Sequence, residues 1–388
     1  MEEVLGILFY LSGFIIIWAM IGYKLSLKII HRLFKFIKVK KNYSHIPTVT
    51  VMVVAHNEEK VILEKLQNLI NIDYPADKIQ FIIASDHSTD ETNQIVRSFI
   101  STQPAQQIRL FEVKNRKGKT NAQNEAQKTV ITEFLVMTDA NSMLDRKAVR
   151  ELMAAFTSED ISYVTGRVTF INESVSAISG AETIYWDSDL LTREIESQMQ
   201  TITAGNGALY ACRNSEYEDF DLIQSHDTAM PLHFALKQKR AIANHDAIAY
   251  EKAGENVEDE FGRKVRMNRL ILKHILPDFR ILNIFKYKWF TYFYFGHRTC
   301  RYLLWLAHFI LYVTSALLAG QTWFYMLVFA GQTLFYLIAL FTAISKYKNK
   351  YFTMVYYYSI TIVAQWVGVY KIITGQTKPF WEKAESTR

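Results

Sequence analysis

Polar side chains that could bind a ligand follow three of the short apolar runs in this sequence. Glu58 comes just after the first of these runs, Asp86 after the second, and Asp139 and Asn141 after the third. A single acid after a strand is commonplace, because such positions also cap the following helix. Several carboxylates and amides are harder to explain by capping when the carboxyl ends of parallel strands share one edge of a sheet. The pattern predicts a ligand site at that edge.

A basic loop offers cations to such a site. Lys119 lies where a helix is expected to open, and Lys114, Arg116 and Lys117 precede it. A helix N-terminus with nearby cations suits a diphosphate, and a solvated loop is the alternative. The segment is not a P-loop, because the position five residues before Gly118 is a valine.

Two further groups could contact substrates. Arg263, Arg266 and Arg269 are three residues apart, which places them on neighbouring turns of one expected helix. Such a cationic ridge could bind a diphosphate or lipid headgroups. Tyr185 and Trp186 could line an acceptor site, or they could belong to the hydrophobic core.

The elements that must position these residues alternate along the chain. Val49–Ala55 (VTVMVVA) is an almost continuous apolar run, typical of a strand buried on both faces. The order predicts a mostly parallel, Rossmann-like α/β sheet. The other expected strands are Ile79–Ala84, Ile108–Val113 and Glu133–Thr138, and the expected helices are Glu58–Ile70, Thr89–Ser101 and Asn121–Thr129.

The amino-terminal segment reads as a membrane anchor. Val4–Gly22 carries no charge and is long enough to cross a hydrocarbon core of about 30 Å. Glu2 and Glu3 precede it, so a retained anchor is favoured over a cleaved signal peptide. The basic residues between 24 and 41 place this side in the cytosol. That stretch is expected to continue the helix into, or along, the headgroup layer, and a solvated linker is the alternative.

Three more uncharged runs follow near the other end: Tyr302–Gly320, Thr322–Ser345 and Tyr351–Tyr370. They predict about three further membrane helices. The chain therefore divides into an anchor with a basic interfacial segment (1–41), a cytosolic α/β domain (42–280), and a membrane portion with an interfacial segment and a short tail (281–388).

Composition excludes some other classes of protein. The net charge of the 388 residues is +6, but the basic residues cluster beside the apolar runs, which favours membrane lipids over nucleic acid as partners. Only two cysteines are present, Cys212 and Cys300, without metal-binding spacing. This count argues against a disulfide scaffold and against a cysteine-based zinc site.

The motifs occur in the order found in one known family. The sequence resembles the membrane-bound family 2 glycosyltransferases, which include the cellulose, hyaluronan and poly-N-acetylglucosamine synthases. The resemblance runs from about Thr48 to the C-terminus. It rests on seven blocks: VVAHNEE, ASDHSTDET, RKGKTNAQNEA, MTDANSMLDRKAVREL, AGNGALYACR, SHDTAMPLHF and FGRKVRMNR.

The resemblance implies a GT-A fold and a nucleotide diphosphate sugar donor, most often UDP-linked. By this likeness, Glu58 and Asp86 would hold the nucleoside and Lys119 would lie near the nucleotide. Asp139 would be the first acid of the metal motif, with Mg²⁺ or Mn²⁺ as cofactor. The base that takes the acceptor hydroxyl's proton in an inverting transfer would be Asp227 in SHDTAM.

This sequence departs from the family pattern at two places. The second acid of the metal motif is Asn141, whose amide oxygen can ligate a hard cation but brings no charge. The Gln-x-x-Arg-Trp motif of processive synthases appears as Arg266 to Leu270. Arg269 matches the family arginine, whereas Leu270 replaces the tryptophan that helps to form the acceptor platform.

The resemblance therefore predicts an inverting glycosyltransferase at the cytosolic face of a bacterial plasma membrane, with a lipid-linked or glycan acceptor. A processive polysaccharide synthase is one alternative. A catalytically silent membrane protein that binds nucleotide sugars is another, although Asp86, Asp139 and Asp227 argue against it. The donor sugar, the acceptor, the linkage and the formation of a homo-oligomer stay open at this stage.

Overall fold

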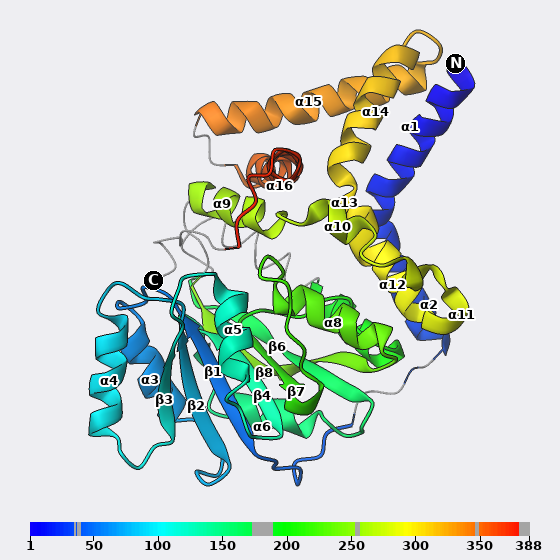
Figure 1. The fold of residues 1–388 in the computed structure, drawn as a ribbon. Coiled ribbons are helices and arrows are strands. Elements are labelled where there is room, and N and C mark those ends of the chain that lie inside the picture. Colours follow the sequence, from blue (N-terminus) through cyan, green and yellow to red (C-terminus); the bar gives the residue numbers. More distant parts are fainter. Residues whose placement is uncertain (35, 37–39, 173–188, 253–256, 346–348, 380–388) are drawn as a thin grey trace.

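The computed structural model describes residues 1–34, 36, 40–172, 189–252, 257–345 and 349–379. An α/β domain forms one end of the molecule, and a group of long helices forms the other (Figure 1). Shorter helices lie between the two parts, among them α9 and α10.

One mixed sheet organises the α/β domain, with the strand order β3-β2-β1-β4-β7-β6-β8-β5. Strands β3, β2, β1 and β4 are parallel to one another, whereas β7 runs antiparallel to both β4 and β6. The strands are β1 (Val49–Ala55), β2 (Ile79–Ser85), β3 (Ile108–Glu112), β4 (Phe134–Asp139), β5 (Met143–Leu144), β6 (Ile161–Phe170), β7 (Leu209–Arg213) and β8 (Arg240–Glu251). The predicted Rossmann-like order of the first four strands is confirmed.

Helices cover both faces of this sheet, because β1 is apolar on both sides. Val51 and Val53 face one core together with α3, α4 and α6, and Met52 and Val54 face the other together with α5 and α8. Side chains alternate between the two faces along a strand, so a continuous apolar run requires a layer on each side. The helices of the domain are α3 (Ile62–Ile70), α4 (Thr92–Thr102), α5 (Lys119–Gln127), α6 (Ala148–Ala154), a helical segment at 189–199, and α8 (His226–Leu236).

Two of the predicted helices begin later than expected. Helix α3 begins at Ile62 rather than Glu58, because the chain first makes a turn in which the Glu58 carbonyl accepts from the amides of Val61 and Ile62. Helix α4 begins at Thr92 rather than Thr89, where the Asp90 carboxylate accepts from the Thr92 amide at 3.1 Å.

The first helix extends beyond its predicted anchor. Helices α1 (Glu2–Ile17) and α2 (Tyr23–Phe34) are joined by a π-helical turn at Trp18–Gly22 into one apolar helix of 33 residues. At 1.5 Å per residue it is about 50 Å long, which exceeds a hydrocarbon core of about 30 Å. Its second half is therefore available to contact the α/β domain, and Tyr23 and Leu27 are fully buried there.

The remaining helices connect the domain to the apolar end of the molecule. They are α9 (Val257–Met267), α10 (Ile271–Ile275), α11 (Ile284–Tyr287), α12 (Trp289–Phe293), α13 (Cys300–Tyr302), α14 (Leu304–Leu318), α15 (Trp323–Ser345) and α16 (Lys350–Ile373), with a 3₁₀ turn at Phe279–Leu282 and a π-helical turn at Tyr294–Thr299. Helix α14 runs beside α1 (Figure 1).

By length and composition, two helices in the described part of the chain could cross a membrane: Glu2–Phe34 and Trp323–Ser345. A third span results if Trp289–Tyr302 and Leu304–Leu318, which meet at a bend of 61°, count as one. The predicted span Tyr351–Tyr370 is a helix, α16, but it does not reach the same apolarity. Its tyrosines at 356–358 and Gln365 reduce the hydropathy, and the number of further spans stays a prediction.

Candidate active site

The carboxyl ends of β2, β1 and β4 bring the predicted polar residues to one edge of the sheet. Val54 of β1 is in register with Ala84 of β2 on one side and with Asp139 of β4 on the other. Asp86 directly follows β2. The two acids therefore flank the end of β1, as the parallel order predicted.

Asp86 holds the basic loop in place. Its buried carboxylate accepts from the backbone amides of Lys117, at 3.1 Å, and Gly118, at 2.9 Å. Gly118 has a φ of 100°, a conformation that side chains disfavour, and helix α5 begins at the next residue. Asp86 thus fixes the start of the helix that carries Lys119.

The loops after β1 and β2 are tied together around Glu58. The Asn57 amide donates to the Ser88 hydroxyl at 3.1 Å, and the Thr89 amide donates to the Asn57 side chain at 2.8 Å. The Glu58 amide donates to the hydroxyl of Thr92 at 2.7 Å, and Glu58 is buried. These bonds hold the two loops together beside Asp86.

Lys119 and Asp139 form an ion pair across the site. The Lys119 ammonium donates to the Asp139 carboxylate, and both side chains remain partly exposed, 24% and 32%. Partial exposure of a charged pair at the ends of parallel strands leaves both groups accessible to a ligand. Asn141 lies in the turn that follows Asp139.

Asp227 and Lys119 both lie close to Gly207. Asp227 lies in the first turn of α8, and its carbonyl accepts from the Gly205 amide at 2.7 Å. A Cβ atom placed on Gly207 would lie 3.8 Å from the Asp227 Cγ atom and 3.9 Å from the Lys119 Nζ atom. The carboxylate, the ammonium and a residue without a side chain therefore border the same small space.

A second cation lies near this carboxylate. Burial lowers the pKa of Arg269, and the charge of Asp227 acts in the opposite direction. The Arg269 guanidinium also donates to the Pro379 carbonyl at 3.4 Å. Arg269 is thus the member of the predicted arginine set that lies near the candidate base.

The predicted ridge of three arginines is wrong in its geometry. Helix α9 ends at Met267, so Arg269 lies in the turn beyond it and not on the helix with Arg263 and Arg266. Arg263 forms an ion pair with Glu260 at 2.7 Å. Arg266 is half-buried in the last turn of α9.

Lys65 holds the turn that contains Asp139 in place, and it was not among the site residues predicted from the sequence. It is fully buried, and its ammonium donates to the Thr138 hydroxyl at 3.1 Å and to the Ser142 carbonyl. Burial lowers its pKa to about 7, and the charges of Asp139 and Glu251 act in the opposite direction. The sequence could have indicated that Lys65 is buried, because it falls on the apolar face of α3.

His226, beside Asp227, is held in its neutral form. It is buried, and its ring nitrogens lie 3.1 Å from the Tyr210 hydroxyl and 3.3 Å from the Tyr217 hydroxyl. Burial, with the charge of Lys119, lowers the pKa of His226 to about 3.

The donor set fits a hard cation that shares its ligands with a diphosphate. Asp139 and Asn141 supply a carboxylate and an amide oxygen from one turn. Among the described residues, no three His, Cys, Asp or Glu side chains form a group that could hold a metal. Mg²⁺ is commonly bound through one or two carboxylates plus substrate phosphates, so the two residues suffice only together with a nucleotide.

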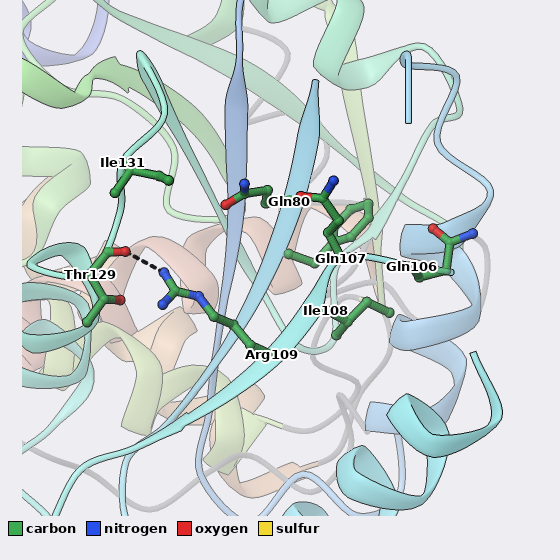
Figure 2. A pocket seen from close by; sticks show the side chains of 8 residues that line it. Gln80, Gln106, Gln107, Ile108, Arg109, Thr129 and Ile131 are labelled. Atoms are coloured by element: carbon green, nitrogen blue, oxygen red, sulfur yellow. Dashed lines mark hydrogen bonds between the residues drawn. The ribbon is translucent and has the colours of Figure 1, made fainter. Parts of the chain in front are cut away.

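Tyr185 and Trp186, the predicted acceptor residues, lie outside the residues that the structure describes, so their role stays a prediction. A hollow of about 320 Å³ is lined by Gln80, Ile108, Arg109 and Ile131, among others, and Arg109 donates there to the Thr129 carbonyl at 2.6 Å (Figure 2). It lies at the amino ends of β2 and β3, opposite the edge that carries the acids.

Two glycines near Asp227 allow a matched test of the site. A Cβ on Gly205 would lie 2.0 Å from the buried Tyr163 hydroxyl, whereas a Cβ on Gly207 meets only ordinary contacts. Gly205→Ala is therefore expected to destabilise the fold by about 1–3 kcal/mol, the usual cost of overpacking. Gly207→Ala is expected to fold normally but to lower turnover roughly tenfold, because it fills the space between base and lysine.

Thermal unfolding and turnover per folded enzyme would be measured for both alanine variants. Normal turnover of Gly207→Ala would contradict the position assigned to the reaction centre.

Comparison with known proteins bears on the fold of the chain. A family model described as glycosyl transferase family 2 matches residues 50–217. No curated protein sequence matches the chain.

Among solved structures, the mannosyltransferase PcManGT from Pyrobaculum calidifontis, in complex with GDP-Man and Mn²⁺, is similar with a TM-score of 0.73 and 20% identity. The similarity covers 96% of this chain and 99% of that one. TarS from S. aureus is similar at a TM-score of 0.38 and 18% identity, over 59% of this chain and 40% of its own. The first match, with the family match, confirms the GT-A fold with helices at both ends.

Proposed function

We propose that the protein transfers a sugar from a nucleotide diphosphate sugar, with inversion, to a lipid-linked or glycan acceptor at the membrane. The match of residues 50–217 to the family model described as glycosyl transferase family 2 supports this proposal. The observation that carries the proposal is that Asp227 and Lys119 both lie close to Gly207, with Asp139 paired to the same lysine. In the proposed scheme, the base, a cation and the carboxylate that would bind a metal therefore lie together at the ligand-binding edge of the sheet.

The donor side of the site is the edge formed by β1, β2 and β4. Glu58 and Asp86 border the position of the nucleoside, and the loop that Asp86 anchors presents Lys119 to the diphosphate. Asp139 and Asn141 would hold a divalent cation, Mg²⁺ or Mn²⁺, which would neutralise charge on the departing diphosphate. Arg266 and Arg269 are assigned to the same leaving group.

The chemical step is a single displacement at the anomeric carbon. Asp227 accepts the proton of the acceptor hydroxyl while that oxygen forms the new glycosidic bond and the bond to the diphosphate breaks. Lys119 offers positive charge where negative charge develops, and it does so from a position fixed before the reaction. The space at Gly207 places the hydroxyl between the base and the donor.

The donor nucleotide is open to direct test. The similar Pyrobaculum enzyme is described with GDP-Man and Mn²⁺, whereas UDP is the common nucleotide in the synthases that the sequence resembles. Protein purified in detergent would be incubated with Mn²⁺ and a panel of UDP- and GDP-sugars, and release of the nucleoside diphosphate would be followed, with mass spectrometry and sizing of any lipid product. Slow hydrolysis of one donor is expected. Binding of a nucleotide sugar without any turnover would instead support a catalytically silent binding protein.

The orientation proposed for the chain is testable by cysteine labelling. The α/β domain is placed in the cytosol, where nucleotide sugars are available, and the loop between α14 and α15 outside. In intact cells, Asp160→Cys, on the exposed surface of the domain, is expected to resist a membrane-impermeant thiol reagent. Gln321→Cys, in the exposed loop, is the matched control and is expected to react. The reverse pattern would show that the catalytic domain faces outward.

A further inference from the structure

A cluster of buried charged residues joins the first membrane helix to the α/β domain. Its centre is Glu196, on the helical segment 189–199, which we call the linking helix. One Glu196 carboxylate oxygen accepts from the Tyr23 hydroxyl at 2.7 Å and lies 2.8 Å from His297 Nδ1. The other His297 nitrogen lies 2.9 Å from Asp189, which also pairs with Arg193 at 2.6 Å. All five side chains are at least 95% buried.

Both ring nitrogens of His297 therefore face carboxylate oxygens. A carboxylate can only accept, so both nitrogens must donate, and His297 is an imidazolium between Glu196 and Asp189. Burial of so many charges is costly unless each is paired with good geometry. Apolar residues of similar volume would often supply as much stability, so stability alone gives no reason for this cluster.

The contacts continue from this cluster to the candidate base. The second Glu196 oxygen accepts from the Thr203 amide at 3.3 Å, and the Thr203 hydroxyl accepts from Arg298 at 3.1 Å. Two residues further along the chain, the Gly205 amide donates to the Asp227 carbonyl at 2.7 Å. The segment 203–207 is thus fixed at one end by Glu196 and Arg298, and at the other it borders Asp227.

Close packing at a glycine keeps the membrane helix in this arrangement. A Cβ on Gly296 would lie 2.2 Å from the ring of Tyr23, so only glycine allows this approach. The Tyr23 ring stacks on His297, with 5.6 Å between ring centroids. Tyr23 belongs to α2, the continuation of the first apolar helix. The membrane helix therefore contacts the carboxylate that anchors the segment beside the base.

We propose that Glu196 and His297 are positioning residues for Asp227, and that Tyr23 connects the first membrane helix to them. The inference rests on the proposed function, because it assumes that Asp227 is the base. Glu196 and His297 touch neither donor nor acceptor in this scheme. They act through Thr203 and the segment 203–207, so they affect the rate of the chemical step and not the affinity for nucleotide.

The test compares turnover with binding in Glu196→Gln. The assay uses the donor selected by the screen described above, with water as acceptor, and the affinity is measured for the matching nucleoside diphosphate with Mn²⁺. Glu196→Gln is expected to lower kcat by about 10- to 100-fold, the effect of a misplaced reacting group, with donor KM and nucleotide Kd within about twofold of wild type. Glu194→Gln, half-exposed on the same linking helix, is the matched control and is expected to change neither.

A second set of variants tests the same inference if Glu196→Gln fails to fold. Thr203→Val removes the hydroxyl that accepts from Arg298 while keeping the side-chain shape, and Thr203→Ser restores it. The valine variant is expected to lose kcat in the same way, and the serine variant to recover it. Tyr23→Phe should show a smaller loss of kcat at unchanged KM.

A merely structural role predicts a different result. Stability and yield would fall while kcat per folded enzyme stayed within twofold of wild type, and that outcome would overturn the inference. Asp227→Asn is measured in parallel: if it keeps normal turnover, the assignment of the base fails and the inference falls with it. If Asp227→Asn is inactive but Glu196→Gln and Thr203→Val turn over normally, only the positioning role is wrong.

Discussion

Asp227→Asn is expected to slow sugar transfer by about two to four orders of magnitude, as loss of a general base does, while nucleotide binding stays intact. The substitution keeps the shape of the side chain and its place in the first turn of α8. It also keeps the backbone bond from Gly205, which involves the Asp227 carbonyl and not the carboxylate. What is lost is the group that accepts the proton, so the effect should appear in kcat and not in the nucleotide Kd.

The matched control is Asp219→Asn, an exposed acid in the same stretch that lies 3.5 Å from Lys128. It should leave kcat and Kd unchanged. Turnover and nucleotide affinity would be measured for both variants with the same donor. Near-normal transfer by Asp227→Asn would show that another group takes the proton.

Asp139→Asn is expected to remove most turnover, by about 100-fold or more, the scale reported for loss of an electrostatic contact to developing charge. The variant loses the charge that pairs with Lys119 and that would ligate a cation, and Asn141 brings no charge to replace it. Turnover would be titrated with Mn²⁺. Nucleotide affinity in the presence of Mn²⁺ should fall as well, which distinguishes this variant from Asp227→Asn.

Two further variants test the assignment of Asp139 and Asn141 as metal ligands. Asn141→Asp should lower the Mn²⁺ concentration needed for half-maximal turnover, because a second carboxylate strengthens a hard-cation site. Asp145→Asn is the control, since its carboxylate accepts from the Lys147 amide in the next turn and asparagine can do the same. Full activity of the wild type in excess chelator would remove the metal role, whatever the variants do.

The strands and the edge of the site could be predicted because local patterns determine them. The run Val49–Ala55 is a strand with those bounds, since a short, β-branched and almost continuously apolar stretch is typical of a sheet covered on both faces. The parallel order of β1, β2 and β4 is then sufficient to predict that Asp86 and Asp139 lie at one edge of the sheet. Helix starts were less certain, as at Glu58, because side chains from neighbouring loops compete for the first amides.

Other parts of the site depend on contacts between segments far apart in the chain. No local pattern indicates that Lys119 and Asp227 lie close to Gly207, because these distances depend on how β7 pairs antiparallel with β4 and positions the segment 203–207. The resemblance to a family supplied Asp227 as the base, and the tertiary structure added the lysine and the glycine beside it.

The pairing of charges was likewise decided by tertiary structure. Three-residue spacing suggested one arginine ridge, but α9 ends before Arg269 and Glu260 takes Arg263. Lys65, Glu196 and His297 look like ordinary helix residues in the sequence, yet they are buried and bonded to partners on other elements. Periodicity reports which face of an element is apolar. Only the packing of distant elements decides which charges are buried together, because each must find its partner across an interface.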